Sequence, residues 1–77
     1  MTHLELDLVS LRNGLPAYGL LPGDVGTVVL VHQNGEAYEV EFVAADGRTI
    51  AIETLTANDI EPVTGRKILH VRQLPAA

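Results

Sequence analysis

Residues 25–43 read VGTVVLVHQNGEAYEVEFV, and this stretch decides the fold. Apolar and polar side chains alternate along both of its halves, a spacing typical of half-buried β-strands. Asn34-Gly35 lies between the halves and is a strong hairpin signal, because both residues tolerate positive φ angles. A second signal of the same kind, Asp46-Gly47, leads into Ile50-Ala51-Ile52. The sequence therefore predicts two consecutive hairpins in a small antiparallel β domain.

The alternation also predicts which residues face the core. A two-residue Asn34-Gly35 loop fixes the register of the first hairpin, and every pair on one face is then largely apolar. This register pairs Val31 with Tyr38, Val29 with Val40, and Thr27 with Phe42.

The second hairpin allows two registers. A two-residue Asp46-Gly47 loop would place the Glu53 carboxylate opposite Val40 in the core, where an unpaired charge is costly. We therefore predict a three-residue Ala45–Gly47 loop with positive φ at Gly47. This register pairs Phe42 with Ile50 and Val40 with Ile52.

The opposite face of these strands is the candidate binding surface. Glu39 would face Glu53 there, and like charges so placed destabilise a sheet by up to about 1 kcal/mol. Such a surface either binds a partner or is a solvated outer wall. The face comprises Val28, Leu30, His32, Glu39, Glu41, Ala51 and Glu53, and we add Glu36 and the loop residue Tyr18 as partner-binding candidates.

The flanking segments complete a five-strand pattern. Residues 6–11 alternate as a first strand, and a long loop with Gly and Pro breakers follows, ending in the Pro22-Gly23-Asp24 turn. Asp24 is expected to accept backbone hydrogen bonds in that turn. Residues 57–60 suggest a single 3₁₀ turn before a short strand at 61–63.

Charge and composition narrow the function classes. The 77-residue chain has a net charge of −5 and only five Lys and Arg residues, which argues against nucleic-acid binding. It has no cysteine, no apolar run of bilayer length and no signal-peptide pattern at its start, so we expect a cytoplasmic protein.

The charge is unevenly distributed along the chain. Residues 1–65 hold ten acidic residues against Arg12 and Arg48, a balance of −8, whereas residues 66–77 hold three basic residues and no acid. This pattern predicts either self-association through residues 66–72 or a tail that docks on its own domain. Residues 67–72 form either an added edge strand or a disordered tail.

No catalytic or metal-binding pattern is found. His3, His32 and His70 lack metal-ligand spacing and are expected to be exposed, and Ser10 has no nucleophile elbow around it. Glu39 and Glu41 share a face but lack an apolar pocket to separate their pKa values. We expect no enzyme activity, no catalytic residues, no metal and no cofactor.

Several blocks resemble a known family. They are Tyr18-Gly19-Leu20, residues 23–29, residues 35–42 and Leu55 with residues 60–63. Together they resemble a widespread bacterial domain family of unknown function whose members are similar to SH3-type barrels. The resemblance covers roughly residues 5–63 and implies an all-β, SH3-like small barrel of five short antiparallel strands. It implies no catalytic residues.

The resemblance also suggests a division of the chain, and charge and size suggest the function. Residues 1–63 would form the barrel, and residues 64–77 a C-terminal extension. The preferred function is a non-enzymatic module that binds a basic protein, for example as an antitoxin-like or immunity-like partner. The alternatives are a nucleic-acid accessory domain, since residues 23–28 resemble the KOW motif, and a structural homo-oligomer built through the extension.

Overall fold

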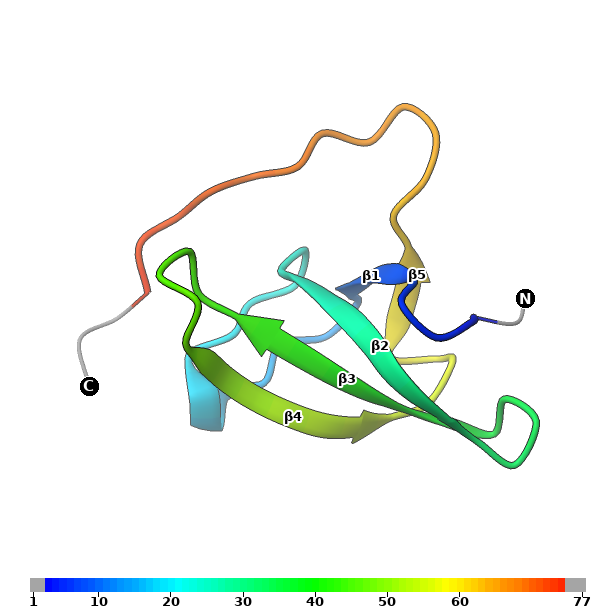
Figure 1. Cartoon of the computed structure of the whole chain (residues 1–77). Coiled ribbons are helices and arrows are strands. Elements are labelled where there is room, and N and C mark those ends of the chain that lie inside the picture. Colours follow the sequence, from blue (N-terminus) through cyan, green and yellow to red (C-terminus); the bar gives the residue numbers. More distant parts are fainter. Residues whose placement is uncertain (1–2, 75–77) are drawn as a thin grey trace.

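The protein folds into one five-stranded antiparallel sheet (Figure 1). The computed structural model describes residues 3–74. Residues 1–2 and 75–77, at the outer ends of the predicted barrel and extension, lie outside the described residues. The all-β class and the five strands are confirmed. The elements are β1 (Leu8–Leu11), the 3₁₀ helix η1 (Pro16–Tyr18), β2 (Val25–His32), β3 (Ala37–Val43), β4 (Thr49–Leu55) and β5 (Ile60–Pro62).

The sheet is curved but open. Its strand order is β4-β3-β2-β1-β5, so β4 and β5 are its two edges, and no ladder joins them within residues 3–74. The architecture therefore matches a small barrel only loosely. The expected 3₁₀ turn at residues 57–60 is instead a hydrogen-bonded turn, in which the Asp59 N–H donates to the Thr56 carbonyl at 2.9 Å.

The inward side chains of the strands form a single core. Burying each larger aliphatic or aromatic side chain contributes about 1.5–3 kcal/mol, which makes this cluster the main stabilising feature. The core consists of Val9, Leu11, Leu20, Val28, Tyr38, Val40, Phe42, Ala51, Leu55 and Ile60.

His3 also joins the core, so the expectation that it is exposed is wrong. Its ring packs edge-on against the Tyr38 ring with centroids 5.1 Å apart. The His3 backbone N–H donates to the Tyr38 hydroxyl at 3.3 Å. The segment before β1 therefore closes one end of the core.

The first hairpin departs from the predicted register after one pair. Val31 faces Tyr38 as expected, but a bulge between Val28 and Leu30 then places Val28, not Val29, opposite Val40. The predicted pairing of Thr27 with Phe42 is wrong for the same reason, since Thr27 faces Glu41.

The hairpin loop also differs from the predicted two residues. The four residues 33–36 form it, and the His32 carbonyl accepts the N–H groups of Gly35 at 2.9 Å and Glu36 at 3.1 Å. Positive φ is found at Gln33 and at both predicted positions, Asn34 and Gly35.

Packing at Gly26 explains the first bulge. A Cβ at Gly26 would lie 2.7 Å from Val40 Cγ1 and 2.8 Å from Phe42 Cε1. The core side of β2 therefore needs a glycine beside these two side chains, and the bulge turns Gly26 and Val28 inward together.

In the second hairpin the predicted loop is confirmed and the predicted pairs beyond it are wrong. Gly47 has φ +90°, and its N–H donates to the Ala44 carbonyl at 2.9 Å across the three-residue loop. A bulge at Ile50 then places Ala51 opposite Phe42, and Glu53 opposite Val40.

Glu53 avoids the expected burial cost because β4 is an edge strand. Its side chain is only partly buried and reaches past the edge of the sheet to the Tyr18 hydroxyl. A carboxylate on the core side is therefore tolerated where it keeps access to water.

Residues 64–74, which we call the strap, form no strand, so the added edge strand is wrong. The last backbone hydrogen bond before them joins the Val63 N–H to the Leu8 carbonyl at 3.2 Å. From the end of β5 the strap arches over the sheet and returns to the body near the β3–β4 hairpin (Figure 1).

We predict that Gly26→Ala lowers the free energy of unfolding by about 1–3 kcal/mol, because the added methyl group overpacks the contact with Val40 and Phe42. Urea unfolding of G26A, V40A and the double variant measures the effect. The double variant should lose less stability than the sum of the single ones, by at least about 0.5 kcal/mol. Strict additivity would show that the two residues do not compete for the same space.

Candidate functional site

The outward side chains of β2, β3 and β4 form two rows across the sheet. Leu30, Glu39 and Thr54 make one row, and Thr27, Glu41 and Ile52 make the next. We call these six residues together with His32 the outer face. Leu30 and Ile52 are 44% and 52% exposed, so apolar surface flanks the two carboxylates.

Hydrogen bonds hold both carboxylates in place. Glu39 Oε1 accepts from the Thr54 hydroxyl, and it lies 3.1 Å from His32 Nε2. The Thr54 hydrogen bond, followed by that of His32, lowers the pKa of Glu39 below its usual 4.5. Glu41 Oε2 accepts from the Thr49 hydroxyl at 2.7 Å. The face therefore presents oriented acceptors.

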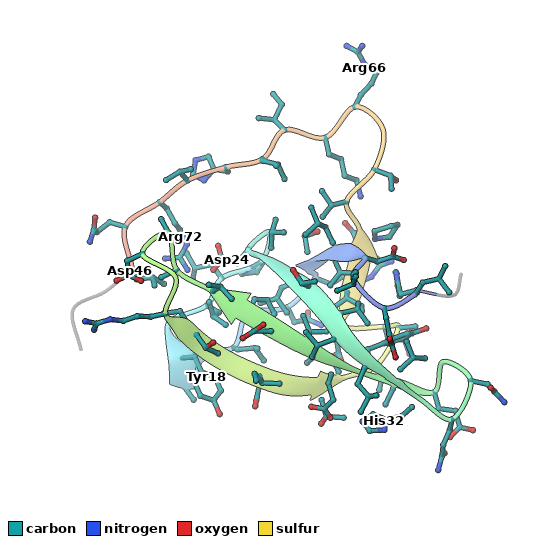
Figure 2. All side chains as sticks on the ribbon, in the orientation of Figure 1. Tyr18, Asp24, His32, Asp46, Arg66 and Arg72 are labelled. Carbon is teal, nitrogen blue, oxygen red and sulfur yellow. The ribbon has the colours of Figure 1, made fainter. Side chains whose placement is uncertain are left out.

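Four of the five Lys and Arg side chains pair with acids elsewhere. Arg12 and Lys67 lie 2.9 Å and 3.9 Å from Glu61, Arg48 lies 3.7 Å from Asp46, and Arg72 pairs with Asp24. Arg66 points away from the sheet at the crest of the strap (Figure 2). Among the described residues, neither Glu39 nor Glu41 has a Lys or Arg within ion-pair distance.

The structure brings three of the predicted partner-binding residues together, namely Leu30, Glu39 and Glu41. Val28 is fully buried in the core, so its expected place on the surface is wrong. Ala51 is buried as well, beneath Phe42. Glu36 lies in the hairpin loop, beyond the two rows.

Glu53 and Tyr18 form a separate pair at the β4 edge. The Tyr18 hydroxyl donates to Glu53 Oε2 at 3.4 Å, and the Tyr18 side chain is 42% exposed (Figure 2). The predicted repulsion between Glu39 and Glu53 is therefore wrong, because Thr54 takes the place opposite Glu39.

The sequence did not predict Ile52 and Thr54 as residues of the outer face, because the bulge at Ile50 exchanges the two faces of β4. One signal could have found them. Ala51 is the smallest side chain of Ile50-Ala51-Ile52, and it fits beneath the large Phe42 ring better than either isoleucine.

Residues 3–74 contain no group of three His, Asp or Glu side chains placed to hold a metal ion. They also contain no helix long and apolar enough to cross a bilayer.

We predict that Thr54→Val raises the pKa of Glu39, because valine keeps the shape of threonine but cannot donate a hydrogen bond. A carboxyl group with a depressed pKa stabilises the fold above its unfolded pKa, and this contribution is lost as the pH falls through the folded pKa. T54V should therefore lose less stability on acidification than the wild type.

Carboxyl ¹³C NMR titration of Glu39 measures the shift directly. Replacing His32 by Gln is the companion variant, and it should move the pKa less, since His32 is the smaller cause. An unchanged Glu39 titration in T54V would contradict the assigned hydrogen bond.

The comparisons with known proteins identify the family alone. A family model described as "Domain of unknown function (DUF4926)" matches residues 5–62. Neither the curated proteins nor the solved structures gave a match. The matched segment holds all five strands and both rows of the outer face, and it ends at Pro62, the last residue of β5. Because the match covers well over half of the chain, this protein belongs to the DUF4926 family of domains of unknown function.

Proposed function

We propose that this domain is a non-enzymatic protein-binding module whose outer face docks on a basic protein surface. The observation that supports the proposal is the pair Glu39 and Glu41, which has no Lys or Arg partner among residues 3–74 and lies between half-exposed Leu30 and Ile52. A basic partner would supply the missing cations.

Apolar contact and charge have different roles in this proposal. Exposed ion pairs are worth only about 0–1 kcal/mol each, so the carboxylates alone would bind weakly. Leu30 and Ile52 would contribute most of the affinity by removing apolar surface from water. The carboxylates would select a basic surface and accelerate the encounter.

The hydrogen bonds of Glu39 and Glu41 favour docking of a partner on the outer face. Glu39 is held by Thr54 and His32, and Glu41 by Thr49, so neither side chain has to be ordered on binding. Preorganised groups lose less conformational entropy when a partner docks. The partner class we favour is a basic enzyme acting on nucleic acid, which the module would neutralise as an antitoxin-like or immunity-like protein.

The nucleic-acid alternative has less support. Of the three basic residues at positions 66–72, Lys67 and Arg72 are already paired with Glu61 and Asp24. Phosphate binding needs several free cations on one surface, and the strap offers Arg66 alone among the described residues.

We predict that Glu41→Lys weakens capture of the partner about tenfold, because it puts a positive charge against a basic surface. Glu5→Lys is the matched control, since it makes the same change of charge at an exposed position outside the two rows. Tagged full-length chains are purified from the native cell, and the captured proteins are quantified. A stoichiometric basic protein should be retained by E5K, reduced by E41K and by Leu30→Ala, and released by raised salt.

Either of two results would rule the proposal out. One is the absence of any basic protein at stoichiometric amount. The other is equal capture by E41K and E5K, which would mean that the outer face is not the docking surface.

A further inference from the structure

The strap is held to the body mainly at its far end. No residue from 64 to 74 makes a backbone–backbone hydrogen bond with the rest of the described chain. Ile68 and Val71 are 92% and 90% exposed, so the middle of the strap buries almost nothing. The far end of the strap is therefore attached to the body through the side chains of Arg72 and Leu74.

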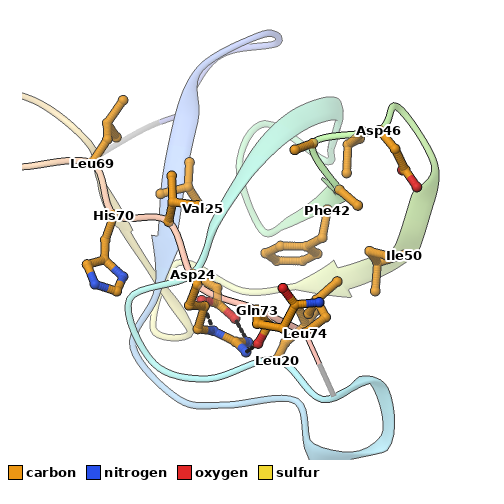
Figure 3. Close-up of a pocket in the computed structure, with 15 residues that line it drawn as sticks. Leu20, Asp24, Val25, Phe42, Asp46, Ile50, Leu69, His70, Gln73 and Leu74 are labelled. Atoms are coloured by element: carbon orange, nitrogen blue, oxygen red, sulfur yellow. Dashed lines mark hydrogen bonds and ion pairs between the residues drawn. The ribbon is translucent and has the colours of Figure 1, made fainter. Parts of the chain in front are cut away.

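Arg72 enters a site that we call the arginine seat, formed by the Asp24 carboxylate and the Gly19 carbonyl. Figure 3 shows Asp24 at this site, beside the labelled residues of the strap. The Arg72 Nε donates to Asp24 Oδ1 at 2.9 Å. The Arg72 Nη2 pairs with Asp24 Oδ2 and also donates to the Gly19 carbonyl at 2.8 Å. Three acceptors thus converge on one guanidinium, a geometry that lysine cannot match.

The arginine seat is built without the strap. Asp24 Oδ2 accepts the Leu21 N–H at 2.8 Å, which confirms the predicted turn role of Asp24. The Asp24 carbonyl accepts the Leu11 N–H at 2.9 Å, and the Gly23 N–H donates to the Leu11 carbonyl at 2.8 Å. Strand β1 therefore fixes the position of the carboxylate before any arginine arrives.

An apolar groove lies next to the arginine seat. Its volume is about 700 Å³, and the strap itself forms one of its walls. Leu74 packs there against the margin of the core, beside Leu20 and Phe42 (Figure 3). The two contacts together hold an arginine and, two residues later, a leucine.

The arginine seat and its occupant differ in their relation to the family. Gly19, Leu20, Asp24 and Phe42 lie within residues 5–62, which the family model matches, whereas Arg72 and Leu74 lie beyond them. The residues that form the arginine seat thus lie inside the matched domain, and the segment now occupying it lies outside the match.

We propose that the arginine seat and the adjoining groove bind an extended segment of another protein that carries Arg-x-Leu or Arg-x-Ile, and that the strap is a tethered occupant which this segment displaces. The site uses other residues than the outer face, so it is independent of the proposed function.

A second copy of this chain is the weaker candidate for the occupant. The short tether after Val63 holds Arg72 near its own arginine seat at an effective concentration in the millimolar range. The identical tail of another copy makes no additional contact. At ordinary protein concentrations it therefore does not displace the tethered strap. A segment of another protein can displace the strap because it can also cover the groove walls at Val25 and Val43, which the strap leaves partly exposed.

The test measures binding of a fluorescent peptide with the sequence of residues 67–74, KILHVRQL, by anisotropy. Full-length Arg72→Ala frees the arginine seat and should bind the peptide at least about tenfold more tightly than the wild type, whose own strap competes. Arg72→Gln is a second variant, in case alanine disturbs the fold.

Three controls assign the binding to the arginine seat. Adding Asp24→Asn to R72A should weaken peptide binding about tenfold or more, and so should a peptide with lysine at the arginine position. Adding Glu41→Lys to R72A changes the outer face alone and should leave peptide affinity unchanged, which separates this site from the proposed function.

Two outcomes overturn the proposal. One is equal peptide affinity in the wild type, R72A and the double variant R72A/D24N. The other is a wild-type dimer at micromolar concentration that D24N dissociates, which would assign the arginine seat to the tail of a second copy.

The pH dependence of peptide binding provides a further prediction. The side-chain hydrogen bond from an arginine lowers the pKa of Asp24 below its usual 3.8, and the charge of His70 acts in the same direction more weakly. Binding should therefore be nearly constant from about pH 5 to pH 8 and decline as the pH falls through the lowered pKa. An affinity that stays constant through that fall in pH would show that the Asp24 carboxylate does not hold the arginine.

Discussion

The close packing of Val40 and Phe42 against Gly26 is the contact on which the rest of the structure depends. The space there excludes even a methyl group, so strand β2 must present its glycine to these side chains. The bulge after Val28 follows from this requirement, and it turns Val28 into the core and Leu30 toward solvent. The composition of the outer face is thus set by a contact inside the core.

The sequence predicted local geometry better than it predicted register. Asn34-Gly35 and Gly47 have the positive φ angles that their residue types favour, because turn preferences depend on the turn residues themselves. The two bulges depend on side chains of the neighbouring strand, Phe42 over Gly26 and over Ala51, which no alternation along one strand can reveal. A shift of one residue exchanges the faces, so Val28 and Glu53 were assigned to the wrong side.

Charge segregation was visible in the sequence, but its structural meaning was not. The basic residues at positions 66–72 predicted either self-association or docking on the same domain, and the structure has Arg72 paired with Asp24, 48 positions earlier. Lys67 pairs with Glu61, as Arg12 does, and Arg48 pairs with Asp46, so among the described residues neither Glu39 nor Glu41 has a Lys or Arg within ion-pair distance. One feature of the sequence thus underlies both proposed binding sites.

The most direct measurement of the central packing arrangement is cysteine accessibility, since the chain contains no native cysteine. Single cysteines replace Val28, Val29 and Ile52, and their reaction with a thiol reagent is followed in the folded protein. The account predicts rapid reaction for V29C and I52C, and reaction of V28C only as fast as the protein unfolds. Rapid labelling of V28C together with protection of V29C would contradict the bulge, and with it the composition of the outer face.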